Sequence, residues 1–95
     1  MREVYKMKAV ITVTGRDSVG IIASVAAYCA DKGANIQDIS QSVLSEFFAM
    51  IMLAEIDELG CDFTEFAEGL TLLGRDKGLD IRAMHEDIFN TMHHI

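Results

Sequence analysis

The side chains best suited to bind a ligand lie in one short polar segment, residues 15–20, with the sequence Gly-Arg-Asp-Ser-Val-Gly. This segment joins a β-type pattern to a helical pattern. Free backbone N–H groups at the start of a helix favour a carboxylate, and Gly20 allows a ligand to approach the backbone closely. The segment is therefore compatible with a site for a small anionic group, with Arg16 as its charged partner.

Each of these residues also has a purely structural interpretation. Asp17 or Ser18 can cap the first turn of the following helix. Gly20 can serve the packing of helix against strand, and Arg16 can be a solvated loop charge. The residues alone leave both interpretations open.

The histidines and cysteines do not have the spacing of a metal site. His93 and His94 are adjacent, so on a helix they point about 100° apart, and no H-x-x-x-H pair exists to anchor an ion. Cys29 and Cys61 form no C-x-x-C motif, so a zinc or thioredoxin-like site lacks its ligands. Cys29 lies in an apolar helical pattern and free cysteines are often buried, so we predict two reduced, partly buried thiols. We predict no metal and no cofactor.

Apolar periodicity predicts the elements that position the polar segment. Residues 8–14 alternate as a strand, and from Val19 a helical stripe of Ile22, Val25, Ala26 and Cys29 leads to Gly33, placed for a left-handed C-cap. The further predicted elements are a polar edge strand over residues 35–45, an apolar strand over 47–56, a helix from Asp62 to Gly78, a strand over 79–84 and a tail helix over 87–95.

This order predicts an α+β fold of the ferredoxin-like βαββαβ type. It has a four-stranded antiparallel sheet with two helices on one face, plus a short C-terminal helix. The 95 residues suffice for a single domain. We expect this domain to span residues 1–95, with a core of about 7–86 and a tail helix of about 87–95.

The predicted third strand is apolar on both faces, although two helices cover only one face of the sheet. One face carries Phe47, Ala49, Ile51 and Leu53, and the other carries Phe48, Met50, Met52 and Ala54. Large exposed apolar patches usually mark interfaces. The tail helix, through Phe89 and Met92, would cover part of the bare face, and a second subunit would cover more. We therefore predict self-association, with cover by the tail helix alone as the alternative.

The charge balance disfavours nucleic acid as a partner. Eight Lys and Arg residues face fifteen Asp and Glu residues, a net charge of −7. RNA-binding domains of this fold stack bases on aromatic residues of the first and third strands, and the first strand here has none. An anionic membrane surface is disfavoured for the same reason. Residues 1–6 lack the apolar core of a signal peptide, and the apolar run 47–54 is too short to span a bilayer, so we expect a cytoplasmic protein.

A resemblance to a known family lies in residues 13–25, Val-Thr-Gly-Arg-Asp-Ser-Val-Gly-Ile-Ile-Ala-Ser-Val, followed by Asp-Lys-Gly-Ala-Asn-Ile at residues 31–36. These segments resemble the signature of the ACT domain. The chain is similar to the small stand-alone ACT-domain proteins of bacteria and archaea over about residues 7–95, including the Met-His-x-Ile ending. One departure is Val19, where many ACT domains have a proline that pre-sets φ.

The resemblance implies a non-enzymatic regulatory domain that pairs with itself, senses amino acids and binds them between subunits near the first strand–helix turn. Carried over to this sequence, the ligand-binding positions are Arg16, Asp17, Ser18, Val19, Gly20, Ile21, Asn35, Ile36 and Asp38. Asn35 and Asp38 are suited to accept hydrogen bonds from a ligand ammonium, although Asn35 also tolerates a turn after Gly33.

Two alternatives belong to other functional classes. One is an oligomerisation or protein-interaction scaffold of the same shape that binds no small ligand, with an unidentified protein partner. The other, more remote, is an acylphosphatase-like hydrolase, because that fold also places an arginine before a helix. The residues around Arg16 do not match the acylphosphatase pattern, and no Ser-His-Asp or Cys-His arrangement emerges. We therefore predict no catalytic residue.

Overall fold

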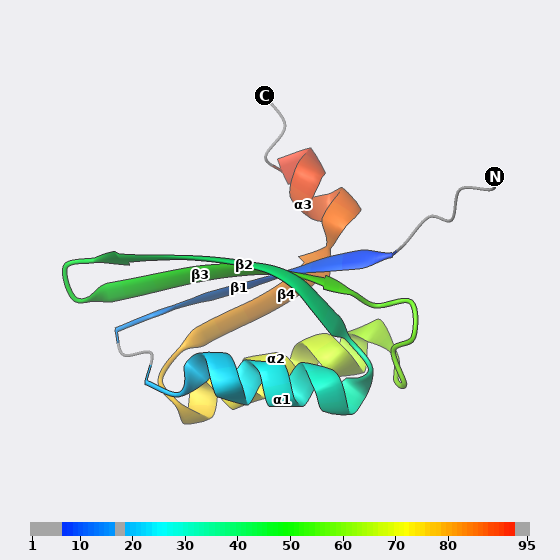
Figure 1. Ribbon diagram of the computed structural model, residues 1–95, viewed down its shortest axis with the longest axis horizontal. Helices are drawn as coiled ribbons and strands as arrows, with labels where there is room; N and C mark the ends of the chain where they lie inside the picture. Colours follow the sequence, from blue (N-terminus) through cyan, green and yellow to red (C-terminus); the bar gives the residue numbers. More distant parts are fainter. Residues whose placement is uncertain (1–6, 17–18, 93–95) are drawn as a thin grey trace.

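The described residues of the computed structural model, 7–16 and 19–92, form four strands and three helices in the predicted order (Figure 1). The elements are β1 (Lys8–Gly15), α1 (Ile21–Lys32), β2 (Asn35–Leu44), β3 (Phe47–Glu55), α2 (Phe63–Asp76), β4 (Asp80–His85) and α3 (Glu86–Met92). The predicted ferredoxin-like fold class is confirmed.

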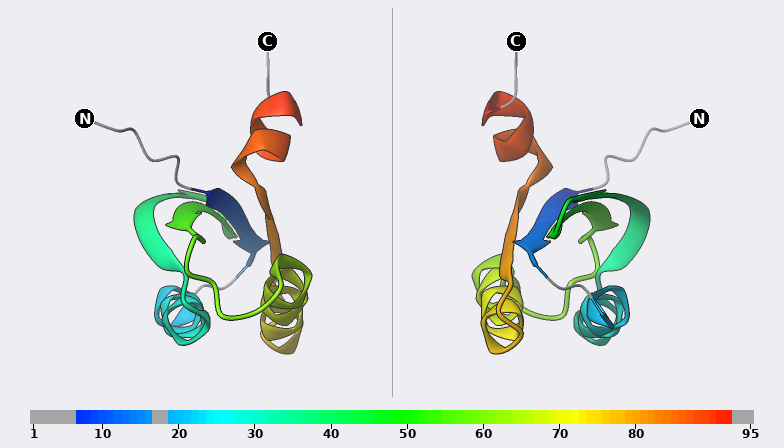
Figure 2. Two further views of the ribbon diagram at one scale, coloured as in Figure 1. Left: turned by 90° about the vertical axis from the view of Figure 1, so that its right-hand side faces the viewer. Right: turned by 90° about the vertical axis from the view of Figure 1, so that its left-hand side faces the viewer.

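The sheet is antiparallel, with the strand order β2-β3-β1-β4. The polar strand β2 therefore lies at an edge, as its composition predicts. Helices α1 and α2 lie side by side on one face, and the short helix α3 rises from the opposite face (Figure 2). None of the helices in the described ranges is long and apolar enough to cross a membrane.

The core fills the space between the sheet and helices α1 and α2. Alternation places one side of each central strand in this core, because successive side chains of a strand point to opposite faces. The buried core residues on the strands β1, β3 and β4 are Ala9, Ile11, Val13, Phe48, Met50, Met52, Ala54 and Ile81. Each fully buried Ile, Met or Phe contributes about 1.5–3 kcal/mol relative to an exposed side chain.

Helix α1 begins two residues later than predicted. Its N-cap is Gly20, which has a φ of 74°, so the helix starts at Ile21 and not at Val19. The buried stripe consequently consists of Ile21, Val25 and Cys29, and the prediction that Ile22 belongs to this stripe is wrong, because Ile22 is exposed. The proposed caps Asp17 and Ser18 lie outside the described residues.

The two glycines within α2 lie where neighbouring elements approach the helix closely. A Cβ at Gly69 would collide with the ring of Tyr28, whose hydroxyl donates a hydrogen bond to the Phe66 carbonyl at 3.0 Å. A Cβ at Gly74 would lie 2.8 Å from the Leu79 carbonyl oxygen. Both glycines permit close contacts with neighbouring elements, and these contacts offset the low helix propensity of glycine. Helix α2 therefore passes through both glycines and continues to Asp76.

The sheet face opposite α1 and α2 is only partly covered. Helix α3 contacts β1 and β4, and Val10 of this face is buried. Phe89 and Met92 were the two residues predicted to cover this face. Phe89 is half-buried, whereas Met92 is exposed to solvent. On β3, Phe47, Ala49 and Ile51 remain exposed.

A matched pair of glycine substitutions tests how the chain turns after α1. Gly33 and Gly78 both have positive φ, 89° and 73°, but a Cβ at Gly33 would lie 2.5 Å from the backbone oxygen of Glu58, whereas a Cβ at Gly78 would meet nothing within 4 Å. We expect Gly78→Ala to lower the free energy of unfolding by about 1 kcal/mol, the cost of left-handed backbone. Gly33→Ala should cost at least about 2 kcal/mol, since the backbone must also shift. Urea unfolding measures both values, and equal losses would contradict the close contact.

Candidate functional site

The predicted ligand-binding residues divide into two groups at opposite ends of α1 (Figure 1). Arg16 and residues 19–21 lie at the beginning of the helix, and we call them the turn half. Asn35, Ile36 and Asp38 follow its end, and we call them the strand half. Helix α1 has 12 residues, so its ends are about 18 Å apart. One chain therefore does not bring the two halves together.

Gly20 gives the turn half its backbone shape. Its φ of 74° is in the left-handed region that favours glycine, and a Cβ there would meet nothing within 4 Å. Gly20 therefore provides the left-handed backbone conformation of the turn and leaves the space beside it open. It is not required for the packing of the helix against the strand. The side chain of Ile21 is fully buried in the core, so a ligand at this turn would contact the backbone of Ile21 and not its side chain.

Arg16 lies against the tip of the β2–β3 hairpin. Its guanidinium is 4.0 Å from the Glu46 carboxylate and 6.0 Å from the centre of the Phe47 ring. Ser45, at the turn itself, has a φ of 60°. Because Arg16 and Glu46 are mostly exposed, their pairing contributes little to stability. These contacts place the guanidinium beside the hairpin tip, and Arg16 stays mostly exposed there.

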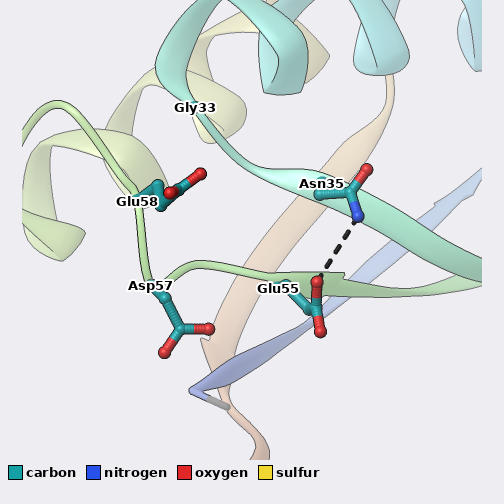
Figure 3. Close-up of a pocket in the computed structure, with 5 residues that line it drawn as sticks. All are labelled: Gly33, Asn35, Glu55, Asp57 and Glu58. Atoms are coloured by element: carbon teal, nitrogen blue, oxygen red, sulfur yellow. Dashed lines mark hydrogen bonds between the residues drawn. The ribbon is translucent and has the colours of Figure 1, made fainter.

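The strand half borders an acidic hollow of about 410 Å³, lined by Gly33, Asn35, Glu55, Asp57 and Glu58 (Figure 3). Asn35 and Glu55 point toward one another from neighbouring strands, and the Asn35 amide donates to Glu55 Oε1 at 3.4 Å. The Asp57 carboxylate accepts a hydrogen bond from the Met7 backbone at 3.0 Å.

The composition of this hollow favours a cation. Three carboxylates lie near the C-terminal end of α1, where the helix dipole is negative. Asn35 uses its amide N–H toward Glu55, which leaves its carbonyl oxygen to accept a hydrogen bond. The sequence pattern points to Asn35 but not to Glu55, Asp57 and Glu58, which it places only at a strand end and in a loop. The acidic side chains that follow the apolar third strand were the feature of the sequence that could have indicated this hollow.

Asp38 and Ile36 lie apart from this hollow. A register shift between Ile36 and Asp38 interrupts the pairing of β2 with β3. Ile36 is half-buried against the core, and Asp38 is exposed opposite Leu53. Neither lines the hollow, so Asn35 is the predicted strand-half residue that the structure places there.

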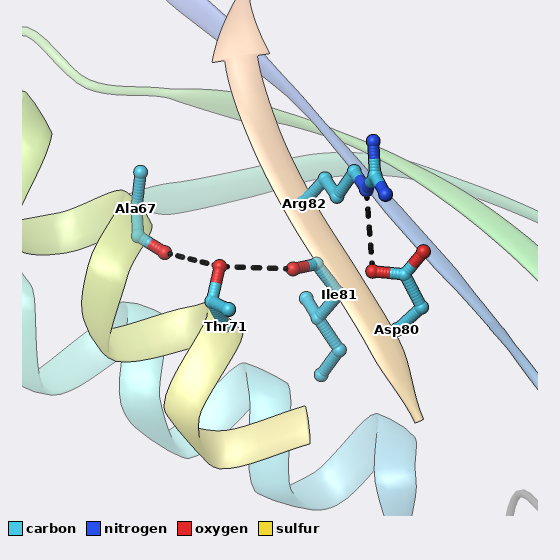
Figure 4. A network of polar contacts seen from close by, with 5 residues as sticks. All are labelled: Ala67, Thr71, Asp80, Ile81 and Arg82. Atoms are coloured by element: carbon cyan, nitrogen blue, oxygen red, sulfur yellow. Dashed lines mark hydrogen bonds and ion pairs between the residues drawn. The ribbon is translucent and has the colours of Figure 1, made fainter. Parts of the chain in front are cut away.

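A second hollow, of about 530 Å³, runs along the outer edge of β4 beside α2. There the Thr71 hydroxyl lies 3.2 Å from the Ala67 carbonyl and 3.2 Å from the Ile81 carbonyl (Figure 4). The Ile81 carbonyl belongs to an edge strand, so this hydroxyl satisfies an acceptor that would otherwise be open to another strand. Arg82 pairs with Asp80 at 3.2 Å on the same strand. These contacts give Thr71, Asp80 and Arg82 a structural role at the edge of the sheet.

No group of three or more potential metal ligands occurs within the part of the chain that the structure describes. The ring of His85 stacks near Phe63, with centroids 4.4 Å apart, and His93 and His94 lie outside the described residues. Cys29 and Cys61 are both free thiols. Burial raises the pKa of the Cys29 thiol to about 11.

Comparison with known proteins identifies similar sequences and structures over almost the whole chain. The family model of the ACT domain matches residues 8–84. A UPF0237 protein of Methanopyrus kandleri is 40% identical over 88 residues, which cover 93% of this chain and 98% of the relative. A UPF0237 protein of Clostridium perfringens is 43% identical over 89 residues, 94% of this chain and 100% of the relative. Among solved structures, an ACT domain protein from Streptococcus pneumoniae superposes with a TM-score of 0.78 and 40% identity, over 90% of this chain and 96% of that one.

The buried thiol gives a prediction about pH. A thiol whose pKa is about 9 unfolded and about 11 folded stabilises the protein fully below pH 9, and this contribution is lost as pH rises through 11. We expect the free energy of unfolding to fall between pH 8 and pH 10.5, and Cys29→Ala to reduce that fall. Cys61→Ala, at the half-buried cysteine, should keep it. Urea titrations at the two pH values measure the effect, and an unchanged fall in Cys29→Ala would contradict this role of burial.

Proposed function

The chain belongs to the ACT-domain family, a family of regulatory domains, and we propose that it binds a free amino acid between two copies of itself. The observation that supports this most directly is the separation of the two halves of the site. The turn half offers helix-start N–H groups and Arg16, which suit a carboxylate. The strand half offers Asn35 and a cluster of carboxylates, which suit an ammonium group.

The chemistry of the two halves matches the two charges of one amino acid. An amino acid carries its carboxylate and its ammonium on the same carbon atom, so one molecule cannot bridge the roughly 18 Å length of α1. In a two-fold assembly, a contact from residue i to residue j is repeated from j to i. Such an assembly can place the turn half of one copy beside the strand half of the other and form two equal sites.

In this proposal the domain is a sensor and not an enzyme. Its role is to change assembly or partner binding when the amino acid is present, and no residue is assigned to catalysis. The site we propose consists of Arg16 with residues 17–21 from one copy, and of Asn35 with the neighbouring carboxylates of Glu55, Asp57 and Glu58 from the partner copy. We place the protein in the cytoplasm, where its free thiols Cys29 and Cys61 would stay reduced.

One observation favours a second candidate, a scaffold of the same fold that binds no small ligand. The exposed apolar residues of β3 would drive association without any ligand. The two candidates differ in a ligand screen, where the scaffold shows no response to amino acids but still associates.

A thermal-shift screen with the twenty amino acids tests the proposed function. A ligand present at 100 times its dissociation constant should stabilise the folded protein by about 2.7 kcal/mol, which raises the melting temperature of a domain this size by about 11–22 °C. We expect one amino acid, or a small chemically related group, to give such a shift. Twenty unchanged melting temperatures at millimolar concentrations would contradict the proposal.

Substitutions of the charged and amide groups test which residues bind. Arg16→Ala and Asn35→Ala should each abolish most of the ligand-induced shift, because each removes a partner of one ligand charge. Arg16→Ala should cost less than about 0.5 kcal/mol of stability, since its ion pair is exposed. The matched controls Arg75→Ala and Asn90→Ala, at exposed positions of α2 and α3, should keep the full shift. A full shift in Arg16→Ala and Asn35→Ala would exclude this site.

A further inference from the structure

The outer edge of β4 has backbone groups that are available to a further strand. The Ile56 N–H donates to the Met7 carbonyl at 2.9 Å, so the odd-numbered residues of β1 direct their backbone groups toward β3 and the even-numbered residues toward β4. Thr12 lies opposite Arg82 in the register, so the even-numbered residues of β4 bond to β1. Ala83, with the residues two positions before and after it, therefore directs its N–H and C=O away from the sheet.

Thr71 of α2 closes one part of this edge and leaves another part open. Its hydroxyl lies 3.2 Å from the Ile81 carbonyl, which agrees with an outward direction of that carbonyl (Figure 4). The outward N–H and C=O of Ala83, two residues further along, have no partner among the residues that the structure describes. Ala83 also lines the hollow of about 530 Å³ between this edge and α2. The open part of the edge is thus a backbone site that lies beside a groove.

Two arginines make one end of the groove basic. Arg82 donates through Nε to Asp80 at 3.2 Å, and its other N–H groups extend beyond this pair. The side chain of Arg75 makes no ion pair or hydrogen bond with any residue in the described part of the chain. Glu68 also lines the hollow, but it precedes Arg75 by seven residues of α2, or about 10 Å, and therefore lies toward the other end. In a chain of net charge −7, this end of the groove favours an acidic ligand.

We propose that the edge of β4 binds an extended segment of a partner protein. This segment adds a strand antiparallel to β4 and carries an apolar residue followed by two acidic residues. In such complexes the main-chain hydrogen bonds give affinity and the neighbouring side chains give specificity. The inference goes beyond the proposed function, because it requires neither an amino acid nor a second copy of the chain.

The register of the added strand follows from the open backbone groups. A residue opposite Ala83 can exchange both hydrogen bonds with it, and its side chain then faces α2 beside the small Ala67, where an apolar side chain has room. The next residue lies opposite Arg82 on the other face, where opposite charges pair across strands. The residue after that faces α2 again, beside Thr71 and Arg75. These two positions are the acidic ones.

A second copy of β4 fits this edge less well than such a segment. A two-fold antiparallel pair centred on Ala83 would set Arg82 opposite Met84, without an acidic partner. A pair centred on Ile81 would set Arg82 opposite Asp80, but the Ile81 carbonyl is already bonded to the Thr71 hydroxyl. The charges and the free backbone groups of this edge are therefore satisfied together by an unlike partner.

An NMR titration of the nitrogen-15-labelled full chain tests the site. The probe is the synthetic peptide Thr-Thr-Val-Glu-Glu-Thr-Thr with blocked ends, whose Val is placed for Ala83 and whose first Glu is placed for Arg82. We expect saturable shifts of the amide signals of residues 80–85 and of the α2 residues that line the hollow, with the largest shift at Ala83, because its N–H gains a partner. A peptide with Lys in place of both Glu residues should bind at least about tenfold more weakly.

Two variants of the edge separate backbone pairing from charge. Ala83→Pro removes the outward N–H, a change that edge strands tolerate, and should raise the dissociation constant of the peptide at least about tenfold. Arg82→Glu should raise it at least about fivefold and should make the Lys-containing peptide the tighter ligand, because the charges are exchanged. The matched control Lys32→Glu makes the same change of net charge at the end of α1, away from this edge, and should leave both constants unchanged. Circular dichroism spectra like that of the native chain establish that the variants are folded.

The remaining outcomes would overturn the inference. They are unchanged amide signals of residues 80–85 at millimolar peptide, and peptide binding that persists in both Ala83→Pro and Arg82→Glu. Shifts of the same signals with protein concentration alone would assign the edge to a second copy. None of these outcomes bears on the proposed amino-acid site, since no residue of that site is changed.

Discussion

The constraint on which this structure depends is that two long helices cover only one face of a four-stranded sheet. Strand β3 is apolar on both faces: Met50 and Met52 are buried under α1 and α2, while Phe47 and Ile51 face outward. Helix α3 covers the end of the bare face near Val10 and does not extend to Phe47. Because apolar surface exposed to water is unfavourable, burial of Phe47 and Ile51 against a second chain would favour association.

A second constraint is the length of α1, which separates the two halves of the proposed ligand site. The helix starts after the left-handed Gly20 and ends at the left-handed Gly33, so the turn half and the acidic hollow beside Asn35 lie at its two ends. Under the proposed function, a single chain thus presents two halves of a site, one suited to a carboxylate and one to an ammonium group. Assembly and ligand binding are therefore coupled in this account, because each complete site needs both copies.

The sequence predicts most of the fold, because local patterns determine it. Alternation and helical periodicity give the element order, and Gly33 marks the end of α1. The sequence does not predict that Ile21 replaces Ile22 in the core, because the positive φ of Gly20 decides where the helix begins. It also does not reveal the contact of Arg16 with Glu46 and Phe47, which joins residues about 30 positions apart. The separation of the two halves of the proposed site follows from the length of α1. That length could be predicted from the number of residues between Gly20 and Gly33.

The central claim is that the bare sheet face requires a second copy, and small-angle X-ray scattering over a concentration series tests it most directly. The single chain has a mass of 10.5 kDa and a Cα radius of gyration of 13.5 Å. The account predicts forward scattering that corresponds to twice this mass, with a radius of gyration clearly above that of one chain. Scattering that fits one chain of this mass and size at every concentration would contradict it.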